Sequence, residues 1–220
     1  MEDLLGIREN NLPLPNAAEW ELKTQRRNTA SLLTLFHMEP SPIGLHLVPY
    51  LLENFGWPHQ KAGTKYPDAE KSFRQTLRYR QATNRGFYID IENAIKRVSI
   101  KFKFSLIKEE HAEWSKTIQH SLQDAYTPYW GFNDLFHKAG TKLKNCFYVT
   151  ADVKKENGKV YIYYYDIKLL SNFIIDNFLQ EIRNRNILID FDARSGHNHG
   201  TKFRIVQNAI PNLYADVQNI

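Results

Sequence analysis

The sequence predicts a mixed chain of strands and helices that folds as a single domain with two lobes, and three observations support this. Several short runs alternate apolar and polar residues, which is typical of strands. Two longer runs repeat apolar residues at the spacing of helices. The composition, with 42% apolar and 13% aromatic residues in 220, is sufficient for one substantial core and argues against disorder.

The first predicted elements are two strands joined by a polar turn. Residues 18–23 and 31–36 have the strand pattern, and the segment 24–28 between them is predicted to turn. Apolar residues at helical spacing then predict a helix over residues 45–55, which the segment Gly56-Trp57-Pro58 ends.

A basic strand and a hairpin follow this helix. Residues 73–80 alternate so that a strand would place four side chains on one face: Arg74, Thr76, Arg78 and Arg80. Such a face suits phosphate contacts, and it equally suits a solvated edge strand. After the turn Asn84-Arg85-Gly86, the runs 87–91 and 97–104 are predicted to pair as a hairpin.

The second half of the chain repeats both patterns. Asn157-Gly158 is a strong signal for a tight hairpin turn between two of the strands. The predicted order is a helix that opens at 129–135, strands at 146–152 and 159–167, an amphipathic helix at 169–183, a strand at 187–194, a polar loop, and a last strand that ends at 205.

The charge and the single cysteine narrow the functional class. With 29 Lys and Arg against 24 Asp and Glu, the net charge is +5, which fits a polyanionic partner. Cys146 is the single cysteine of the sequence, so an intramolecular disulfide and a multi-cysteine zinc site are excluded. We expect a reducing, cytoplasmic setting. No apolar stretch approaches the length of a membrane span, and the N-terminus lacks the charge pattern of a signal peptide.

One motif near the N-terminus points to chemistry. In Glu21-Leu22-Lys23 the two charged side chains face the same side of a strand, while Leu22 faces the core. Pro15-Asn16 precedes Glu21 at the spacing of a Pro-Asp-x4-Glu-x-Lys nuclease core, with Asn16 where an Asp is expected. In such a core, carboxylates hold Mg²⁺ against a phosphate and the ammonium orients the attacking water. A solvated strand face also produces Glu-x-Lys, so the two residues by themselves are weak support.

A second cluster of polar residues lies in the loop between the last two strands. Hydrogen-bond donors concentrate there, in Arg194, His197, Asn198, His199, Lys202 and Arg204. This composition suits the reading of base edges, because Arg pairs with guanine and Asn with adenine. Two alternatives are a metal site at His197 and His199, which lack nearby cysteines, and a solvent-exposed structural loop.

These runs occur together, and in the same order, in a known family. The runs are Glu2-Asp3-Leu4-Leu5, Pro15 to Lys23, Ser31 to Phe36, Tyr129-Trp130-Gly131-Phe132, and His199 to Ile205. The chain resembles the MvaI/BcnI restriction endonucleases, relatives of the mismatch-repair nicking nuclease MutH in the Pro-Asp-(Asp/Glu)-x-Lys superfamily.

The resemblance implies an α/β (α+β) fold with a central mixed sheet flanked by helices and two lobes around a DNA cleft. It implies a catalytic lobe at about residues 1–60, a recognition lobe at about 70–220 and a recognition loop at 193–204. A monomer would use Mg²⁺ to cut double-stranded DNA at a short, GC-rich, CCNGG-like site, with a cognate DNA methyltransferase as its biological counterpart.

The resemblance also assigns roles at the catalytic site. Glu21 and Lys23 match the family's Glu and Lys, Glu2 matches a carboxylate on the preceding helix, and Asn16 takes the place of the metal-binding Asp. An amide oxygen coordinates weakly and brings no negative charge, so we expect reduced or lost activity, whether Asn16 is natural or a replacement. Family members carry a further segment before the Glu2 helix, which implies that this chain is trimmed or part of a longer protein.

The remaining candidates would contact DNA. His37, at the end of the strand near the scissile site, is a candidate for reading the central base pair, although a structural histidine is the more common role. Phosphate contacts are expected from Arg26, Arg27, Arg74, Arg78, Arg85 and Lys103. The sequence thus predicts a type II restriction endonuclease. The alternatives are a MutH-like nicking endonuclease and a DNA-binding module without catalysis.

Overall fold

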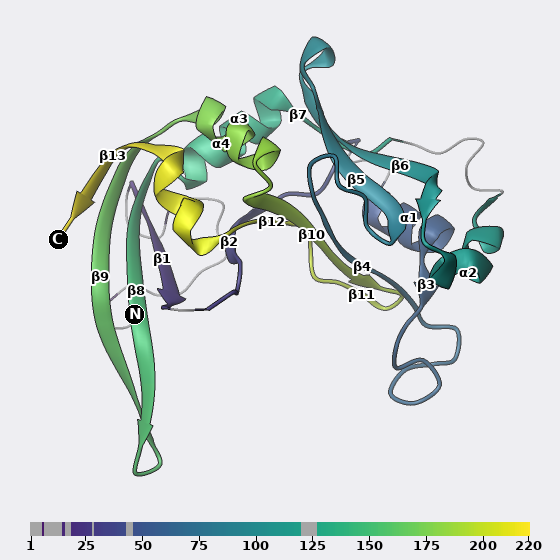
Figure 1. The fold of residues 1–220 in the computed structure, drawn as a ribbon, viewed down its shortest axis with the longest axis horizontal. Helices are drawn as coiled ribbons and strands as arrows, with labels where there is room; N and C mark the ends of the chain where they lie inside the picture. The colour runs from purple at the N-terminus through teal and green to yellow at the C-terminus, as the bar shows by residue number, and fades with distance from the viewer. Residues whose placement is uncertain (1–5, 7–14, 16–18, 28, 43–45, 120–126) are drawn as a thin grey trace. The chain divides into compact units, whose positions relative to one another are not determined.

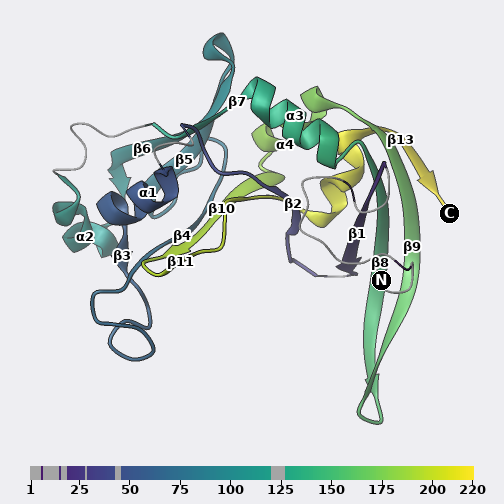
Figure 2. The same ribbon diagram turned by 180° about the vertical axis from the view of Figure 1, so that it is seen from behind.

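The structure is a computed structural model that describes residues 6, 15, 19–27, 29–42, 46–119 and 127–220 (Figures 1 and 2). The chain divides into two compact units, and each is discontinuous in sequence. The first unit comprises the described residues up to Leu35, together with Asn133–Asn186 and Ile205–Ile220. The second unit comprises Phe36–Phe132 and Ile187–Arg204.

The first unit contains one mixed sheet of four strands. Its order is β1 (Trp20–Arg26), β8 (Asn145–Glu156), β9 (Lys159–Phe173) and β13 (Tyr214–Asn219). β1 runs parallel to β8, and the other neighbours are antiparallel. A parallel pair requires a long crossover, and here the whole segment between β1 and β8 supplies it.

Two α-helices and a 3-10 helix belong to the first unit and contribute apolar faces to its core. They are α3 (Phe132–Lys142), α4 (Ile175–Arg183) and the 3-10 helix η6 (Gln207–Leu213). In α4 the apolar side chains of Phe178, Leu179 and Ile182 are buried, as the helical spacing requires. Asp176 in the first turn and Arg183 in the last turn complement the helix dipole.

The second unit contains the other two sheets. The larger has the order β2 (Leu33–His37), β12 (Lys202–Ile205), β10 (Ile187–Arg194), β4 (Lys71–Leu77) and β3 (Trp57–Pro58), and the short β11 (His197–Asn198) pairs with β10. The smaller consists of β5 (Arg85–Glu92), β6 (Arg97–Ile107) and β7 (Tyr129–Gly131). Its helices are α1 (Leu47–Phe55), α2 (Ala112–Thr117) and the short 3-10 turns η3 (Asn93–Ile95) and η4 (Glu109–His111).

Aromatic side chains form the core of the second unit. The ring of Phe73 lies edge-on to the rings of Phe87 and Phe191, at centroid distances of 5.4 and 5.5 Å. All three side chains are almost fully buried. Edge-to-face packing of this kind adds to the free energy that burial itself contributes, so the core holds β4, β5 and β10 in fixed positions.

The predicted class, a mixed α+β fold, is confirmed, and the structure distributes its strands over three sheets. The strand 187–194 is found with the predicted bounds. The hairpins at 85–107 and 145–173 are also present, and Asn157 and Gly158 both have positive φ angles, 50° and 75°, as a tight hairpin turn requires.

Three predicted elements need correction. β4 ends at Leu77 and Arg80 has a φ of 48°, so Arg78 and Arg80 do not continue the strand face of Arg74. Residues 169–173 belong to β9 and not to the helix, because an apolar run satisfies both periodicities and here pairs with β13. Residues 129–131 form β7, and the predicted helix opens only at Phe132.

The lobes proposed from the sequence were continuous segments, whereas the compact units are interleaved. The reason lies in the parallel pairing of β1 with β8, which brings Glu21 together with residues from the middle of the chain. Among the described helices, none is long and apolar enough to cross a membrane.

Candidate active site and DNA-reading surface

Glu21 and Lys23 share one face of β1, as predicted. The Lys23 ammonium lies 2.7 Å from Oε1 of Glu21 and donates a hydrogen bond to the backbone oxygen of Leu35 at 3.2 Å. The Glu21 side chain is only 3% exposed and that of Lys23 is 13% exposed. A buried carboxylate requires a cationic partner, so β1 holds this pair in a defined geometry and not as a solvated strand face.

Lys142 is a third member of this cluster, and the sequence reasoning missed it. It is the last residue of α3, and its ammonium lies 2.8 Å from Oε2 of Glu21. Its side chain is as buried as that of Lys23, at 13% exposed. One carboxylate between two ammonium groups leaves the cluster with a net positive charge, which suits a phosphate group.

Cys146 and two tyrosines, Tyr148 and Tyr214, adjoin the cluster. Cys146 is the partner of Glu21 in the register of β1 and β8, and Tyr148 is the partner of Lys23. Burial raises the pKa of the Cys146 thiol to about 12, and burial likewise raises the pKa of Tyr214 well above its ordinary value. Neither group is therefore available as an anionic nucleophile near neutral pH.

The donor set around Glu21 fits a hard cation in part. Oε2 of Glu21 is buried and accepts no well-directed hydrogen bond from the described residues, although the Lys142 ammonium is close. A carboxylate oxygen in this state retains lone pairs for a metal ion. The other predicted site residues, Glu2 and Asn16, lie outside the described residues. Among the residues that the structure describes, no group of three or more His, Cys, Asp or Glu side chains forms a ready metal site.

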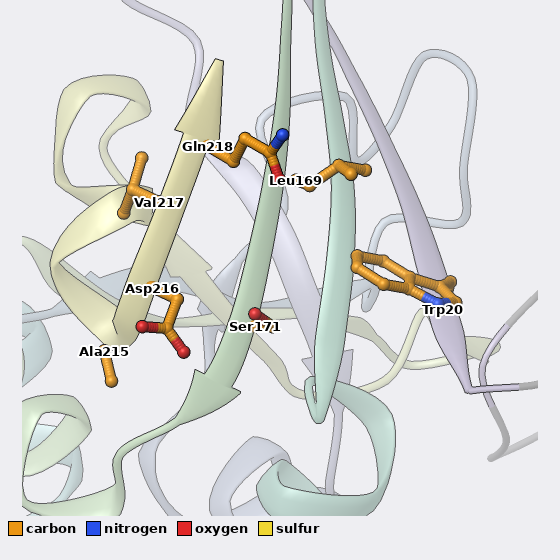
Figure 3. A pocket seen from close by; sticks show the side chains of 7 residues that line it. All are labelled: Trp20, Leu169, Ser171, Ala215, Asp216, Val217 and Gln218. Carbon is orange, nitrogen blue, oxygen red and sulfur yellow. The ribbon is translucent and has the colours of Figure 1, made fainter. Parts of the chain in front are cut away.

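The opposite face of the same sheet carries a shallow hollow of about 580 Å³ (Figure 3). Trp20, the neighbour of Glu21 on β1, lines it together with residues of β9 and β13, which include Leu169, Asp216 and Gln218. Because adjacent residues of a strand face opposite sides, this hollow is separated from Glu21 and Lys23 by the sheet itself.

A polar hollow of about 400 Å³ lies on the large sheet of the second unit. It is lined by side chains of β4, β10 and β12: Arg74, Gln75, Thr76, Asp190, Phe191, Asp192, Lys202 and Arg204. Asp190 accepts a hydrogen bond from Thr76 and pairs with Arg204 at 2.7 Å, and Arg74 lies 3.4 Å from Asp192. Three of the predicted DNA-binding residues, Arg74, Lys202 and Arg204, thus lie together in one preorganised set of donors and acceptors.

The loop that precedes β12 is held by Glu39. The Glu39 carboxylate accepts hydrogen bonds from the Thr201 backbone N–H and from its hydroxyl, both at 3.0 Å, and from Asn198 at 3.4 Å. Gly200 has a φ of 79°, and a Cβ there would lie 3.2 Å from Cδ2 of His37. The structure therefore brings His37 next to the predicted recognition loop, which requires glycine at this point.

Arg194 and the two loop histidines differ in their surroundings. Arg194 pairs with the buried Glu70 at 2.9 Å, and its guanidinium lies 4.5 Å from the ring centre of Tyr66. His197 and His199 are exposed, with ring centroids 4.2 Å apart. The paired Arg194 is thus fixed in position, while the histidines remain accessible to a ligand.

The arginines expected at phosphates are also in different environments. Arg26, Arg74 and Arg78 are exposed, and Arg27 pairs with Asp152 at 3.0 Å. Arg85 instead stacks on two tryptophan rings, with centroid distances of 4.2 Å to Trp57 and 4.8 Å to Trp114. Burial lowers the pKa of Arg85. This arrangement favours a structural role for Arg85. Lys103 is exposed and lines a hollow with Arg80 and Asp90.

Comparisons with known proteins agree on one family. The sequence profile of the MvaI/BcnI restriction endonuclease family matches residues 1–214. A solved structure titled "Restriction endonuclease MvaI-cognate DNA substrate complex" is similar with a TM-score of 0.76 and 25% identity, over 99% of this chain and 85% of that chain. "Restriction endonuclease MvaI in the absence of DNA" matches with a TM-score of 0.59 and 23% identity, over 100% of this chain and 82% of that one. A search among curated proteins finds no match.

Proposed function

Because this chain belongs to the MvaI/BcnI restriction endonuclease family, we propose that it hydrolyses phosphodiester bonds of double-stranded DNA at a short GC-rich, CCNGG-like site with the help of Mg²⁺. The observation that carries the proposal is the buried Glu21 carboxylate between the ammonium groups of Lys23 and Lys142. We further propose that the protein acts as a monomer in the cytoplasm and is accompanied by a cognate DNA methyltransferase.

Each residue of the cluster has a role in this proposal. Mg²⁺, when bound, would supply charge neutralisation and a more acidic water. Glu21 would hold the cation, and the Lys142 ammonium beside it would neutralise charge on the phosphate. Lys23, fixed by Glu21 and by the Leu35 carbonyl, would orient the attacking water and stabilise the pentavalent transition state. Asn16 would be the second, weaker ligand, and Glu2 would be a further carboxylate of the site.

The second unit would read the sequence. A carboxylate such as Asp190 or Asp192 accepts a hydrogen bond from the amino group of cytosine, and an arginine such as Arg204 pairs with guanine. Both types of group line the polar hollow, and this supports a preference for G·C pairs. His37, His197, Asn198 and His199 would read further base edges, Arg194 would support the loop, and exposed arginines such as Arg26 and Arg78 would contact phosphates.

The test is cleavage of supercoiled plasmid DNA with Mg²⁺, by this chain and by an Asn16→Asp version, followed by sequencing of the ends. We expect discrete ends from the Asp version and few or none from this chain, because the amide lacks the charge that holds the cation. Glu21→Gln in the Asp background should abolish cutting. Glu19→Gln, an exposed neighbour on a surface ion pair with Lys144, should not.

Other outcomes would change the assignment. No cleavage by any version, together with sequence-specific and Mg²⁺-independent DNA binding, would identify a binding module in which Asn16 is natural. Single-strand nicks that depend on hemimethylated DNA would identify a MutH-like nicking enzyme.

A further inference from the structure

The β8–β9 hairpin continues beyond its sheet as a two-stranded ribbon. β1 pairs with β8 only as far as Ala151, and β13 pairs with β9 only from Lys168 onward. In the described part of the chain, residues 152–165 therefore pair in strand register only within the hairpin, and we call this segment the ribbon. Figures 1 and 2 show it extending past the ends of β1 and β13.

Both faces of the ribbon expose large side chains. On one face Tyr161, Tyr163 and Tyr165 are 42%, 41% and 54% exposed. On the other face lie Val160, Ile162 and Tyr164, at 58%, 54% and 39%. A hairpin that protrudes from its sheet gains little from packing, and a contiguous exposed apolar surface usually marks an interaction site. The ribbon is therefore a candidate interaction surface.

The far end of the ribbon is basic. Within the ribbon, three exposed lysines, Lys154, Lys155 and Lys159, stand against two acidic residues, Glu156 and Asp152, and Asp152 is already paired with Arg27 at the base. The Lys154 ammonium lies 5.1 Å from the ring centre of Tyr163, and Arg27, at the base, stacks 4.0 Å from that of Tyr165. Among the described residues, no ion pair uses any of the three lysines. A cationic surface with tyrosine hydroxyls suits the phosphate and sugar groups of a nucleic acid.

We propose that the ribbon is an arm that binds duplex DNA outside the recognition site. The inference rests on the proposed function, because it places the DNA by the cluster around Glu21. The ribbon belongs to the same sheet as Glu21, whose partner in β8 is Cys146. From Cys146 to Lys155 a strand reaches about 30 Å, which corresponds to about 9 base pairs of duplex. A two-stranded ribbon also has the width that a major groove admits.

A second copy of this chain is the competing occupant, through the face of Val160, Ile162 and Tyr164. Electrostatic repulsion disfavours this pairing, because two ribbons side by side would bring six lysines together. DNA, in contrast, supplies the opposite charge. The lysines would contact phosphates and the tyrosines would pack along the backbone, which adds affinity without sequence preference.

The experiment measures the salt dependence of duplex binding by the full chain. The probe is a mixed-sequence duplex of about 40 base pairs, which exceeds the reach of the ribbon. The arm variant carries Lys154→Gln, Lys155→Gln and Lys159→Gln. The matched control carries three exposed lysines of the second unit changed in the same way, Lys61→Gln, Lys108→Gln and Lys116→Gln, so that both lose the same charge.

We expect the arm variant to reduce the slope of log K against log salt by about 2 to 3, at roughly 0.9 per lost phosphate contact, and the control to leave it nearly unchanged. Arginine at the three arm positions should restore the slope. This variant distinguishes the effect of lost charge from an effect of damage to the hairpin. If unaltered chain binds the duplex and the arm variant keeps its slope, the arm is refuted while the proposed function stands. If the unaltered chain does not bind the duplex, the proposed function is refuted, and the arm, which rests on it, is refuted as well.

Light scattering tests the competing occupant. A concentration-dependent dimer that Ile162→Ser converts to a monomer, with DNA binding unaltered, would overturn the arm in favour of contact between two copies.

Discussion

Oε2 of Glu21 lies 2.8 Å from the ammonium group of Lys142, a residue brought to the site by the last turn of α3. With Lys23 on Oε1, this contact completes a buried cluster with one negative and two positive charges. Removal of one partner from a buried ion pair is costly because the remaining charge lacks compensation. Lys142 thus ties α3 to β1, and under the proposed function it would lie where charge develops during phosphate cleavage.

Substitution of Lys142 should impair cleavage. In the Asn16→Asp background we expect Lys142→Met to lower the cleavage rate by about 10² to 10³, the usual cost of one transition-state contact, with little change in DNA affinity. The control is Lys144→Met, which removes an exposed lysine from a surface pair with Glu19. Single-turnover experiments measure the cleavage rate, and binding isotherms measure the DNA affinity. Equal rates for the two variants would remove Lys142 from the mechanism.

The contact between Glu39 and Thr201 should stabilise the second unit. Thr201 is fully buried and donates two hydrogen bonds to the Glu39 carboxylate. Thr201→Val keeps the shape and removes the hydroxyl donor, so we expect the free energy of unfolding to fall by about 1 to 3 kcal/mol. Urea denaturation measures this fall. Thr64→Val, at an exposed hydroxyl, should change it by no more than about 0.5 kcal/mol, and a similar effect at both positions would contradict the prediction.

Glu92 should make stability fall in acid. Burial raises its pKa, but hydrogen bonds from Lys101, Ser99 and Arg97 outweigh this and lower it from 4.5 to about 2. A depressed pKa means that protonation weakens the folded state, so the contribution of Glu92 is complete above pH 4.5 and is lost as the pH falls toward 2.

Urea midpoints at several pH values between these limits test the contribution of Glu92. The unaltered chain should lose more stability over this range than Glu92→Gln, because the amide has no proton to gain. The exposed Glu113→Gln should behave like the unaltered chain. Parallel pH profiles for the unaltered chain and Glu92→Gln would show that the three hydrogen bonds do not favour the charged form.

Cys146 should be unreactive in the folded protein. It is buried beside Glu21, and burial raises its pKa to about 12, so almost no thiolate exists near pH 8. We expect a chromogenic disulfide reagent to modify Cys146 only after unfolding. Ser105→Cys introduces an exposed thiol as an internal control, and this thiol should react at once. Rapid labelling of the native, unaltered chain would show that the sheet opens around Glu21.

The local parts of the site were predictable, whereas its assembly was not. Glu21 and Lys23 are two residues apart on a strand, so their common face follows from the pleat alone. Lys142 is remote in sequence and becomes their neighbour only through the parallel pairing of β1 with β8 and the position of α3. In the sequence, no pattern around Lys142 distinguishes it from the surface lysines of the chain.

The same distinction applies to the fold. The Asn157-Gly158 turn signal predicted the hairpin, and the pattern of apolar residues predicted β10. Both predictions succeeded because they depend only on residues that are neighbours in sequence. The boundary between β9 and α4 was wrong by several residues, because Leu169 to Phe173 suits either element and its pairing with Tyr214 to Asn219 decides the outcome. Arg85 likewise stacks on Trp57 and Trp114, which no local pattern reveals.

The chain passes between its two units four times, after Leu35, Phe132, Asn186 and Arg204. A hybrid with the reading surface of a relative would therefore need both segments of the second unit, 36–132 and 187–204, transplanted together. One recombination event cannot achieve this. If β4, β10 and β12 read the DNA as proposed, a change of specificity is expected from substitutions on these strands and not from exchange of a ready-made module.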